Sequence, residues 1–293
     1  MVCDICPREC SVDRKIQKGF CGMPESFVVA RAALHFWEEP FLSGKSGSGT
    51  VFFSGCNLRC IYCQNHSISA GKYGKEISDT ELMKIFDSLI EQGANNINLV
   101  TPTHYAGHLE KVLKEYNSPV PVIYNSSGYE KKETIERLEG LIDIYLPDLK
   151  YIGSERAEKY SSAPDYFEYA SEAIKEMLRQ TGKAVFDENS MMKKGTVIRH
   201  LVLPKNTNQS IKIIDWLKEN IPTDTYISLM SQYTPVIHSD KFSELNRKIT
   251  KREYEKVTSY ILKSGFENVL IQTGDSTKES FIPDFDMTGI DNI

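Results

Sequence analysis

Cysteine is missing from most of this 293-residue sequence, because all seven cysteines fall within the first 63 residues. Long apolar runs are also missing, and no segment approaches the roughly 18–20 apolar residues that a membrane-spanning helix needs. The N-terminus is charged from Asp4 onward and has no apolar stretch of the kind that a secretory signal contains. We therefore expect a cytoplasmic protein without a membrane segment.

The sequence also lacks an excess of positive charge. The formal net charge is −5, so the chain lacks the positive field that holds nucleic acid, and we expect no nucleic-acid partner. The composition, with 40% hydrophobic and 26% charged residues, is otherwise that of an ordinary globular protein. At this length the chain can bury a large core in one domain and still carry a small appendage.

From about residue 50 onward, short apolar runs alternate with amphipathic segments. Strands are predicted over residues 51–53, 97–100, 120–124, 142–146, 197–203, 226–230 and 269–272, and helices over 78–93, 108–116, 130–139, 157–181, 210–220 and 251–264. This alternation predicts a parallel α/β sheet, and the number of units favours a full or partial (β/α) barrel of the TIM type. No Gly-x-Gly-x-x-Gly follows a predicted strand, which disfavours a dinucleotide-binding sheet.

The sequence predicts two domains. Residues 1–47 form a small cysteine-rich module with its linker, since regular periodicity is scarce before about residue 30 and a Gly-Ser loop covers residues 43–50. Residues 48–293 form the barrel.

Three cysteines directly follow the first predicted barrel strand. Cys56, Cys60 and Cys63 have the spacing Cys-x3-Cys-x2-Cys, and three thiolates on one tight loop can bind three irons of a [4Fe–4S] cluster. The fourth iron is then open to an exogenous chelating ligand, as catalytic zinc is. A zinc or redox loop is the alternative, but zinc usually takes four ligands, and His66 lies too close to Cys63 for the usual spacing.

The segment around these cysteines resembles the signature of the radical S-adenosylmethionine (SAM) superfamily. It reads Gly55-Cys56-Asn57-Leu58-Arg59-Cys60-Ile61-Tyr62-Cys63-Gln64-Asn65. The aromatic residue before the last cysteine makes it particularly similar to the pyruvate formate-lyase activating-enzyme branch. Leu34–Pro40, Asn98–His104 and Arg199–Pro204 add similarity to a subgroup of homologues of that branch.

The resemblance implies a specific chemistry. A [4Fe–4S] cluster on Cys56, Cys60 and Cys63 would bind the amino and carboxylate groups of SAM at its open iron. One electron from the reduced cluster would cleave SAM to methionine and a 5′-deoxyadenosyl radical, and that radical would abstract hydrogen from a substrate. The protein would orient the reactants and exclude water and oxygen.

The resemblance also implies which residues bind SAM. Tyr62 would lie near the adenine, and Asn65 belongs to the same signature. Thr101 and Thr103 stand where the activating enzymes usually carry Gly-Gly-Glu, which holds the SAM amino group. Ser126 lies in a segment that corresponds to Asp-Thr-Asn-Gly. A buried aromatic, a Pro turn with a helix cap and a Ser turn are the structural alternatives.

Two further candidates lie at later strand ends. Asp148 and Lys150 point to the same face of a strand and match the family's Asp-Leu-Lys, so they would bind the SAM ribose and carboxylate, unless they form a simple ion pair. Arg199 matches the strand arginine of the family and is expected to contact SAM or substrate. Its neighbour His200 points to the opposite face and is equally well explained as a core histidine.

The other four cysteines form a set of their own. Cys3, Cys6, Cys10 and Cys21 supply four thiolates, which is a complete ligand set for structural Zn²⁺ or for a second [4Fe–4S] cluster. Their spacing does not choose between the two metals.

The sequence thus predicts a radical SAM oxidoreductase that receives electrons from a donor such as flavodoxin or ferredoxin. By resemblance, its substrate would be a glycyl-radical enzyme or another protein or peptide. The runner-up within this class acts on a small molecule or RNA. The alternative of another class is a non-catalytic iron–sulfur or zinc protein that binds a partner or carries electrons; a carrier would need a fully ligated cluster, which the trio does not provide.

Overall fold

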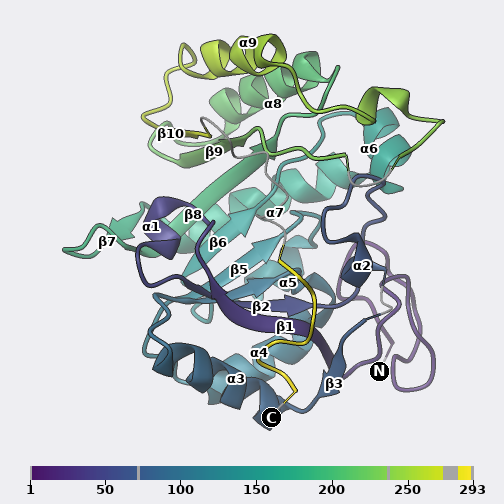
Figure 1. The fold of residues 1–293 in the computed structure, drawn as a ribbon, viewed down its shortest axis with the longest axis vertical. Helices are drawn as coiled ribbons and strands as arrows, with labels where there is room; N and C mark the ends of the chain where they lie inside the picture. The colour runs from purple at the N-terminus through teal and green to yellow at the C-terminus, as the bar shows by residue number, and fades with distance from the viewer. Residues whose placement is uncertain (1, 71–72, 236–237, 273–282, 292–293) are drawn as a thin grey trace.

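The computed structural model describes residues 2–70, 73–235, 238–272 and 283–291. Their strands form one ten-stranded sheet in the order β10-β9-β8-β6-β5-β4-β2-β1-β3, with β7 paired to β8 (Figure 1). Within the described residues, β10 and β3 are the two edges of this path and do not pair with each other.

The centre of the sheet is parallel and follows the order of the chain. Parallel pairing joins β2 (Ser48–Phe53), β4 (Ile97–Val100), β5 (Val122–Ser126), β6 (Ile144–Pro147), β8 (Met192–Leu201), β9 (Tyr226–Met230) and β10 (Asn268–Ile271) in succession. Each of these strands overlaps one of the strands that the sequence predicts. A parallel sheet wound in chain order and left open at its edges confirms the expected α/β fold and is compatible with a partial barrel.

Helices connect these strands. They are α1 (Pro40–Ser43), α2 (His66–Ser69), α3 (Asp79–Glu91), α4 (Ala106–Glu115), α5 (Lys132–Glu136), α6 (Ser154–Ser161), α7 (Tyr166–Thr181), α8 (Thr207–Asn220) and α9 (Lys251–Ile261), with the 3-10 turns η1 (Thr103–Tyr105) and η2 (Ser243–Leu245). Helix α3 begins at a capping box in which the Ser78 side chain accepts from the Glu81 amide and Glu81 accepts from the Ser78 amide. Thr250 and Glu253 form the same motif before α9.

The helix expected over 157–181 is two helices. Ser162 adopts a left-handed conformation with φ 52° at the end of α6, and Pro164 precedes the start of α7. A left-handed residue followed by proline cannot continue a helix, so the chain turns and α7 packs against β6 and β8.

Three strands of the sheet, β1, β3 and β7, were not predicted. β1 (Phe27–His35) pairs antiparallel with β2 and with the short β3 (Lys75–Ile77), and β7 (Val185–Phe186) pairs antiparallel with β8. The sheet therefore begins inside the segment 1–47 that the sequence assigns to the cysteine-rich module. The division of the chain at residue 47 stays a prediction.

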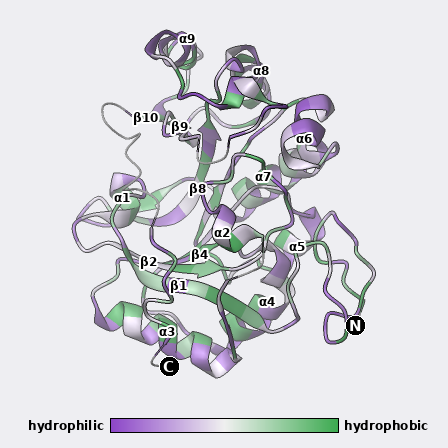
Figure 2. Cartoon of the chain, turned by 45° about the vertical axis from the view of Figure 1, so that its right-hand side comes forward, coloured by the Kyte–Doolittle hydropathy of each residue, from purple (hydrophilic) through white to green (hydrophobic). Residues whose placement is uncertain are grey.

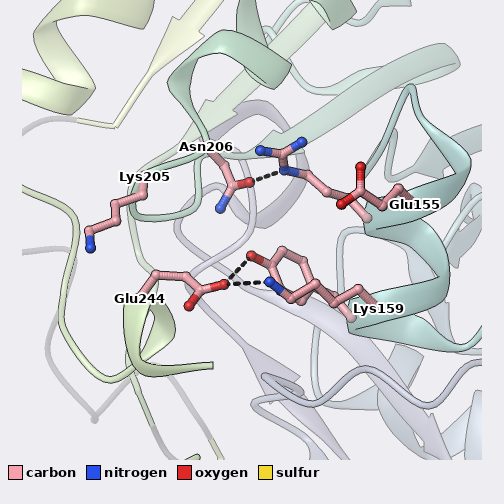
Figure 3. Close-up of a pocket in the computed structure, with 7 residues that line it drawn as sticks. Glu155, Lys159, Lys205, Asn206 and Glu244 are labelled. Carbon is pink, nitrogen blue, oxygen red and sulfur yellow. Dashed lines mark hydrogen bonds and ion pairs between the residues drawn. The ribbon is translucent and has the colours of Figure 1, made fainter. Parts of the chain in front are cut away.

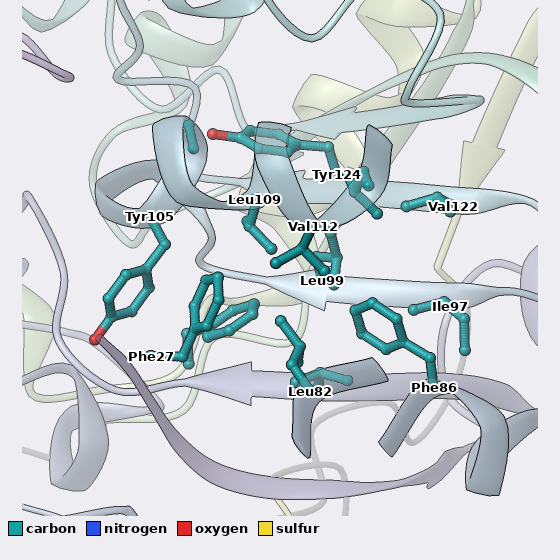
Figure 4. Packing of buried hydrophobic residues seen from close by; sticks show 14 of the residues in the cluster. Phe27, Leu82, Phe86, Ile97, Leu99, Tyr105, Leu109, Val112, Val122 and Tyr124 are labelled. Atoms are coloured by element: carbon teal, nitrogen blue, oxygen red, sulfur yellow. The ribbon is translucent and has the colours of Figure 1, made fainter. Parts of the chain in front are cut away.

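Successive side chains along β2 and β4 point to opposite faces of the sheet, and one of these faces packs into the core. Val51 and Phe53 of β2 and Leu99 of β4 are almost fully buried and pack with α3 and α4 in the largest hydrophobic cluster (Figure 4). Phe52 and Val100 point to the other face of the sheet. Figure 2 shows the strands mostly green, while the outer turns of helices such as α6 and α9 are purple. No helix in the described part of the chain is long and apolar enough to cross a membrane.

Leu99→Ala tests this core. Leu99 is 0% exposed, so its truncation leaves a void between the sheet and its helices and should lower the free energy of unfolding by about 2–5 kcal/mol. Lys84→Ala, on the exposed side of α3, is the control and should change it by less than about 0.5 kcal/mol. Urea unfolding monitored by circular dichroism measures both. Equal, small effects would contradict the packing described here.

Candidate functional site

A cavity of about 1110 Å³ opens at the carboxyl ends of the parallel strands. It is lined by residues at or just beyond successive strand ends: Cys56, Cys60 and Cys63 after β2, Thr101 after β4, Asn125 and Ser126 at the end of β5, Asp148 and Lys150 after β6, Arg199 in β8, Met230 at the end of β9 and Gln272 after β10. Parallel pairing brings these ends to one edge of the sheet, which is where such folds place their active sites. The structure thus collects most of the predicted site residues in one cavity.

The cysteine loop leaves β2 through a glycine that no other residue could replace without movement. Gly55 has φ 82°, and a Cβ at this position would lie 2.3 Å from Met23 Cγ and 2.8 Å from the Cys21 carbonyl oxygen. Only glycine combines this backbone conformation with such a close approach. The loop is therefore packed directly against the N-terminal segment.

Backbone hydrogen bonds hold the rest of the loop. The Arg59 amide donates to the Ser161 carbonyl at 3.2 Å, and the Ile61 amide donates to the Tyr160 carbonyl at 2.9 Å. The Ser161 hydroxyl donates to Cys60 Sγ at 3.0 Å, and the Leu58 amide donates to Cys56 Sγ at 3.4 Å. Such N–H and O–H donors favour the thiolate form that binds a metal.

Burial dominates the titration of the two inner thiols. It raises the pKa of Cys56 to about 12, and the neighbouring Cys60 and Cys63 thiolates add to the shift. Burial also raises the pKa of Cys60 to about 11, although the Lys150 ammonium works in the opposite direction. Three mutually repelling thiolates in a low-dielectric cavity need a cation, because the charged forms are otherwise unfavourable there.

A positive side chain lies beside these sulfurs. Lys150 is ion-paired with Asp148, and both line the cavity. Burial alone would lower the pKa of Lys150, but the Asp148 carboxylate and the Cys60 thiolate outweigh it and raise that pKa. Lys150 therefore stays charged and faces both a carboxylate and the cysteine loop.

Four of the other predicted SAM contacts lie in the wall of this cavity. Tyr62, Asn65, Thr101 and Ser126 line the cavity, and the Tyr62 hydroxyl pairs with the Tyr151 hydroxyl at 2.6 Å. Thr101 has φ 60°, which is unusual for a β-branched residue and places local strain at the cavity wall.

Thr103 does not line this cavity. It is 1% exposed, and its hydroxyl donates to Glu130 Oε1 at 2.5 Å. Glu130 was not predicted as a functional residue, although it is fully buried and also accepts from the Tyr124 hydroxyl at 3.3 Å. Burial raises the pKa of Glu130 to about 7, against the effect of these hydrogen bonds. Only the tertiary structure brings Thr103 and Glu130 together, and no sequence motif marks this pair.

Arg199 lies in the cavity wall and has two carboxylate partners. Its Nε donates to Glu39 Oε1 at 2.9 Å, and its Nη2 bonds Glu39 and Glu38. Glu38 also accepts from Asn98 Nδ2 at 2.9 Å. The Arg199 guanidinium outweighs the effect of burial and lowers the pKa of Glu39. The Glu39 carboxyl and the Arg199 guanidinium are thus both charged, and Arg199 positions two acids at the wall.

His200 is a core histidine. Its Nδ1 lies 2.7 Å from the Leu149 carbonyl oxygen and its Nε2 lies 2.9 Å from Ser210 Oγ. Burial lowers the pKa of His200 to about 4, so the ring is neutral at pH 7.

A second, smaller pocket of about 210 Å³ lies between α6 and η2 (Figure 3). Several of its polar side chains are bonded to one another: Lys159 and Tyr160 donate to Glu244, and Arg156 donates to Asn206. It contains no predicted site residue, and we assign no chemistry to it.

The cysteine trio fits an iron–sulfur cluster better than a single ion. No three His, Cys, Asp or Glu side chains among the described residues converge on one point as the ligands of a single metal ion do. A cubane cluster takes one thiolate at each of three irons, so its ligands stay apart. Three cysteines on the wall of one cavity, beside open space, match that donor set.

Comparison with known proteins identifies the family. Residues 50–234 match the family model of the radical SAM superfamily. The chain belongs to the radical SAM superfamily. Membership implies a [4Fe–4S] cluster and SAM, and it supports radical SAM chemistry and an enzyme that needs an electron donor. The matching family model describes the superfamily as a whole and does not identify the activating-enzyme subgroup.

One relative and several solved structures resemble the chain. MJ0674, an uncharacterized protein of Methanocaldococcus jannaschii, is 30% identical over 264 residues, which are 87% of this chain and 72% of that protein. The FeFe-hydrogenase maturase HydG of Carboxydothermus hydrogenoformans is 16% identical with a TM-score of 0.50, over 80% of this chain and 56% of that one. Streptococcus suis SuiB bound to SAM is 17% identical with a TM-score of 0.49, over 75% of this chain and 49% of that one. The chain thus spans about half the length of these solved structures, and the likeness to HydG shows the fold.

Glu130→Gln tests the buried carboxyl. Because the pKa of Glu130 is raised from 4.5 to about 7 in the folded state, the folded chain holds this proton more tightly than the unfolded chain does. Wild type should therefore lose roughly 3 kcal/mol of stability relative to Glu130→Gln as the pH rises from about 4.5 to about 7.

Urea unfolding at several pH values under anaerobic conditions measures the difference. Glu133→Gln, at an exposed position on α5, is the matched control, and its difference from wild type should not change over this range. Parallel pH curves for wild type and Glu130→Gln would show that Glu130 has an ordinary carboxyl environment.

Proposed function

We propose that this radical SAM enzyme holds its cluster on Cys56, Cys60 and Cys63 and abstracts a hydrogen atom from a protein or peptide. The observation that carries the proposal is the juxtaposition, in one cavity, of three thiols, the half-buried Lys150 ammonium and the ends of the parallel strands. When bound, the cluster and SAM supply the 5′-deoxyadenosyl radical. The residues of the chain bind SAM and the substrate and orient them.

The binding of SAM is assigned to the wall beside the cysteine loop. Lys150 carries a positive charge next to the cluster ligands and suits the SAM carboxylate, while Asp148 accepts hydrogen bonds from ribose hydroxyls. Tyr62 packs along the same wall and suits the adenine ring. Thr101, Asn65 and Ser126 offer oxygens to the SAM ammonium group. Thr103 is not assigned to SAM, since its hydroxyl is bonded to Glu130 and it does not line the cavity.

The rest of the cavity supports a macromolecular substrate. A volume of about 1110 Å³ exceeds the roughly 300–1,000 Å³ of ordinary small-ligand pockets, so it leaves room beside one SAM molecule. Phe36 and Trp37, which are 51% and 56% exposed, lie where β1 leads into α1 and offer aromatic surface at the cavity. Its acidic side chains, Glu38, Glu39 and Asp148, outnumber Lys150 and Arg199, which disfavours RNA.

The finer assignments follow the resemblance to activating enzymes. The target is proposed to be a glycyl-radical enzyme or a similar protein, and the electron donor a flavodoxin or ferredoxin. None of the seven cysteines forms a disulfide, which fits a reducing compartment, and we place the reaction in the cytoplasm. A small molecule is the second candidate substrate, because Arg199 and Glu39 of the cavity wall are only 12% and 6% exposed and would suit a small polar ligand.

Reductive cleavage of SAM is the first test. Anaerobically reconstituted wild type with SAM and dithionite should release methionine and 5′-deoxyadenosine, detected by mass spectrometry. Cys60→Ala should release neither, because it removes one of three cluster ligands. Cleavage that survives in Cys60→Ala, or its absence in wild type with full iron and sulfide, would disprove the assignment.

Transfer of deuterium then identifies the substrate class. The enzyme is given a deuterated cell extract separated into protein, RNA and small-molecule fractions, and 5′-deoxyadenosine is examined for deuterium. The proposal predicts transfer from the protein fraction that is lost after protease treatment. Transfer only from the small-molecule or RNA fraction would replace it by the corresponding alternative.

Lys150→Met tests the SAM carboxylate contact. Loss of one charge-assisted hydrogen bond should weaken SAM binding about tenfold, which corresponds to roughly 1.4 kcal/mol. Lys159→Met is the matched control, because Lys159 is also ion-paired with a carboxylate but lies outside the cavity. Calorimetric titration of the reconstituted enzyme with SAM measures both. An unchanged dissociation constant in Lys150→Met would remove Lys150 from the SAM site.

A further inference from the structure

Three hydroxyl groups form a continuous hydrogen-bonded chain that ends at a cysteine of the site. The Tyr62 and Tyr151 hydroxyls lie 2.6 Å apart, and the Tyr151 hydroxyl lies 2.7 Å from Ser161 Oγ. Ser161 Oγ lies 3.0 Å from Cys60 Sγ. Tyr62, Tyr151 and Ser161, which we call the hydroxyl chain, thus connect the wall of the cavity with the sulfur of Cys60.

The hydroxyl chain is buried. The exposed fractions of Tyr62, Tyr151 and Ser161 are 8%, 2% and 0%. Buried hydroxyls need hydrogen-bond partners, and in the described part of the protein the hydroxyls of Tyr151 and Ser161 bond only within this chain and to Cys60. The two inner hydroxyls therefore depend on each other, on Tyr62 and on Cys60.

The end of α6 fixes the inner hydroxyl. Ser161 is the last residue of α6, which ends there because Ser162 has the left-handed φ of 52°. The carbonyls of Ser161 and of the residue before it accept from the amides of Arg59 and Ile61. The backbone is thus bonded to α6 on both sides of Cys60, and these bonds keep the Ser161 side chain beside its sulfur.

Tyr151 is held by packing as well as by its hydroxyl. Its ring meets the Tyr166 ring edge-on, with the ring centres 5.3 Å apart. The Lys150 amide, directly before Tyr151, donates to the Tyr166 hydroxyl at 3.0 Å. The Tyr151 hydroxyl can therefore be removed by a change to phenylalanine while the ring keeps its neighbours.

A metal on Cys60 would fix the direction of these hydrogen bonds. A ligating thiolate has no proton, so Ser161 must donate its one proton to Cys60 Sγ. Ser161 Oγ can then only accept from Tyr151, and the Tyr151 oxygen can only accept from Tyr62. All three hydroxyl dipoles point their positive ends toward the sulfur, and hydrogen bonds in such a chain strengthen one another.

We propose that Tyr151 and Ser161 are positioning residues that orient Cys60 and raise the reduction potential of the radical SAM cluster. The inference rests on the proposed function, because it takes Cys60 as a cluster ligand. A donor proton beside a ligand sulfur favours the reduced cluster, since reduction adds negative charge. Hydrogen bonds to a metal ligand also fix its orientation.

Ser161→Ala removes the donor to Cys60 Sγ. The cluster should become harder to reduce, with the reduction equilibrium changed about tenfold, which is about 59 mV for a one-electron couple. The measurement is a potentiometric titration of the anaerobically reconstituted enzyme, followed by electron paramagnetic resonance in the absence of SAM. The relevant signal is the one that is missing from Cys60→Ala.

A second spectroscopic readout reports the donor itself. Electron–nuclear double resonance in H₂O and D₂O should detect an exchangeable proton coupled to the cluster in wild type. Ser161→Ala should lose this coupling, and Tyr151→Phe should retain it, because the Ser161 hydroxyl is still present. A merely structural role of Ser161 would leave the coupling unchanged, and that result would overturn the proposal.

Tyr151→Phe tests the chain as a unit. It keeps the Ser161 hydroxyl but removes the donor to it, so the reduction potential should fall in the same direction as in Ser161→Ala and by less. Tyr160→Phe is the matched control, because the Tyr160 hydroxyl donates to Glu244 at 2.7 Å, outside the cavity. Its reduction potential should equal that of wild type.

The two variants together decide the outcome. An unchanged potential in both would overturn the proposal, and a change in Ser161→Ala alone would overturn the chain, because Ser161 would then act without Tyr151. If Ser161→Ala retains no cluster, Tyr151→Phe decides: a lowered potential supports the proposal, and a wild-type potential overturns it.

Failure of the proposed function has a different signature. A wild type that cleaves no SAM, but whose potential shifts as described in the variants, would overturn the proposed function and keep the role of the hydroxyl chain. A Cys60→Ala variant that retains every cluster signal of wild type would overturn both.

Discussion

The parallel hydrogen-bonded register from β2 to β10 is the constraint on which the site depends. Because these strands run in the same direction, their carboxyl ends meet at one edge, and residues separated by more than 200 positions line one cavity. The backbone turns sharply at two of these ends, where Gly55 and Thr101 have φ of 82° and 60°. The Thr101 amide still donates to the Asn125 carbonyl of β5 at 2.9 Å, which fixes the position of its turn.

Charge in the cavity is organised in ion pairs. Lys150 is paired with Asp148, and Arg199 is paired with Glu38 and Glu39. Removing one partner of such a pair leaves an uncompensated charge, so these side chains stabilise one another's position. In the proposed SAM site, these fixed charges would face the ammonium, carboxylate and sulfonium groups of the cofactor.

The N-terminal segment connects the two cysteine sets physically. Its Arg8, Phe20 and Met23 contact the loop that carries Cys56. Radical chemistry needs an ordered cluster that excludes solvent and oxygen. A short segment without helices or strands provides such order only if something other than its own core holds it.

The sequence by itself determined the family, the parallel α/β fold and the trio Cys56, Cys60 and Cys63, because spacing along one loop and alternation of strands with helices are local patterns. It also indicated that Lys150 and Asp148 share a face, since that follows from strand geometry. It did not show that β1 joins the sheet, because the pairing of Phe27–His35 with β2 and β3 is formed across the fold.

The tertiary structure alone decided the partners of Arg199 and Thr103. Both were chosen as SAM contacts by their place in the chain, yet Arg199 is bonded to Glu38 and Glu39, and Thr103 to the buried Glu130. Glu130 carries a raised pKa only because the fold removes it from water. Long-range contacts and burial are properties of the packed chain, and no spacing in the sequence encodes them directly.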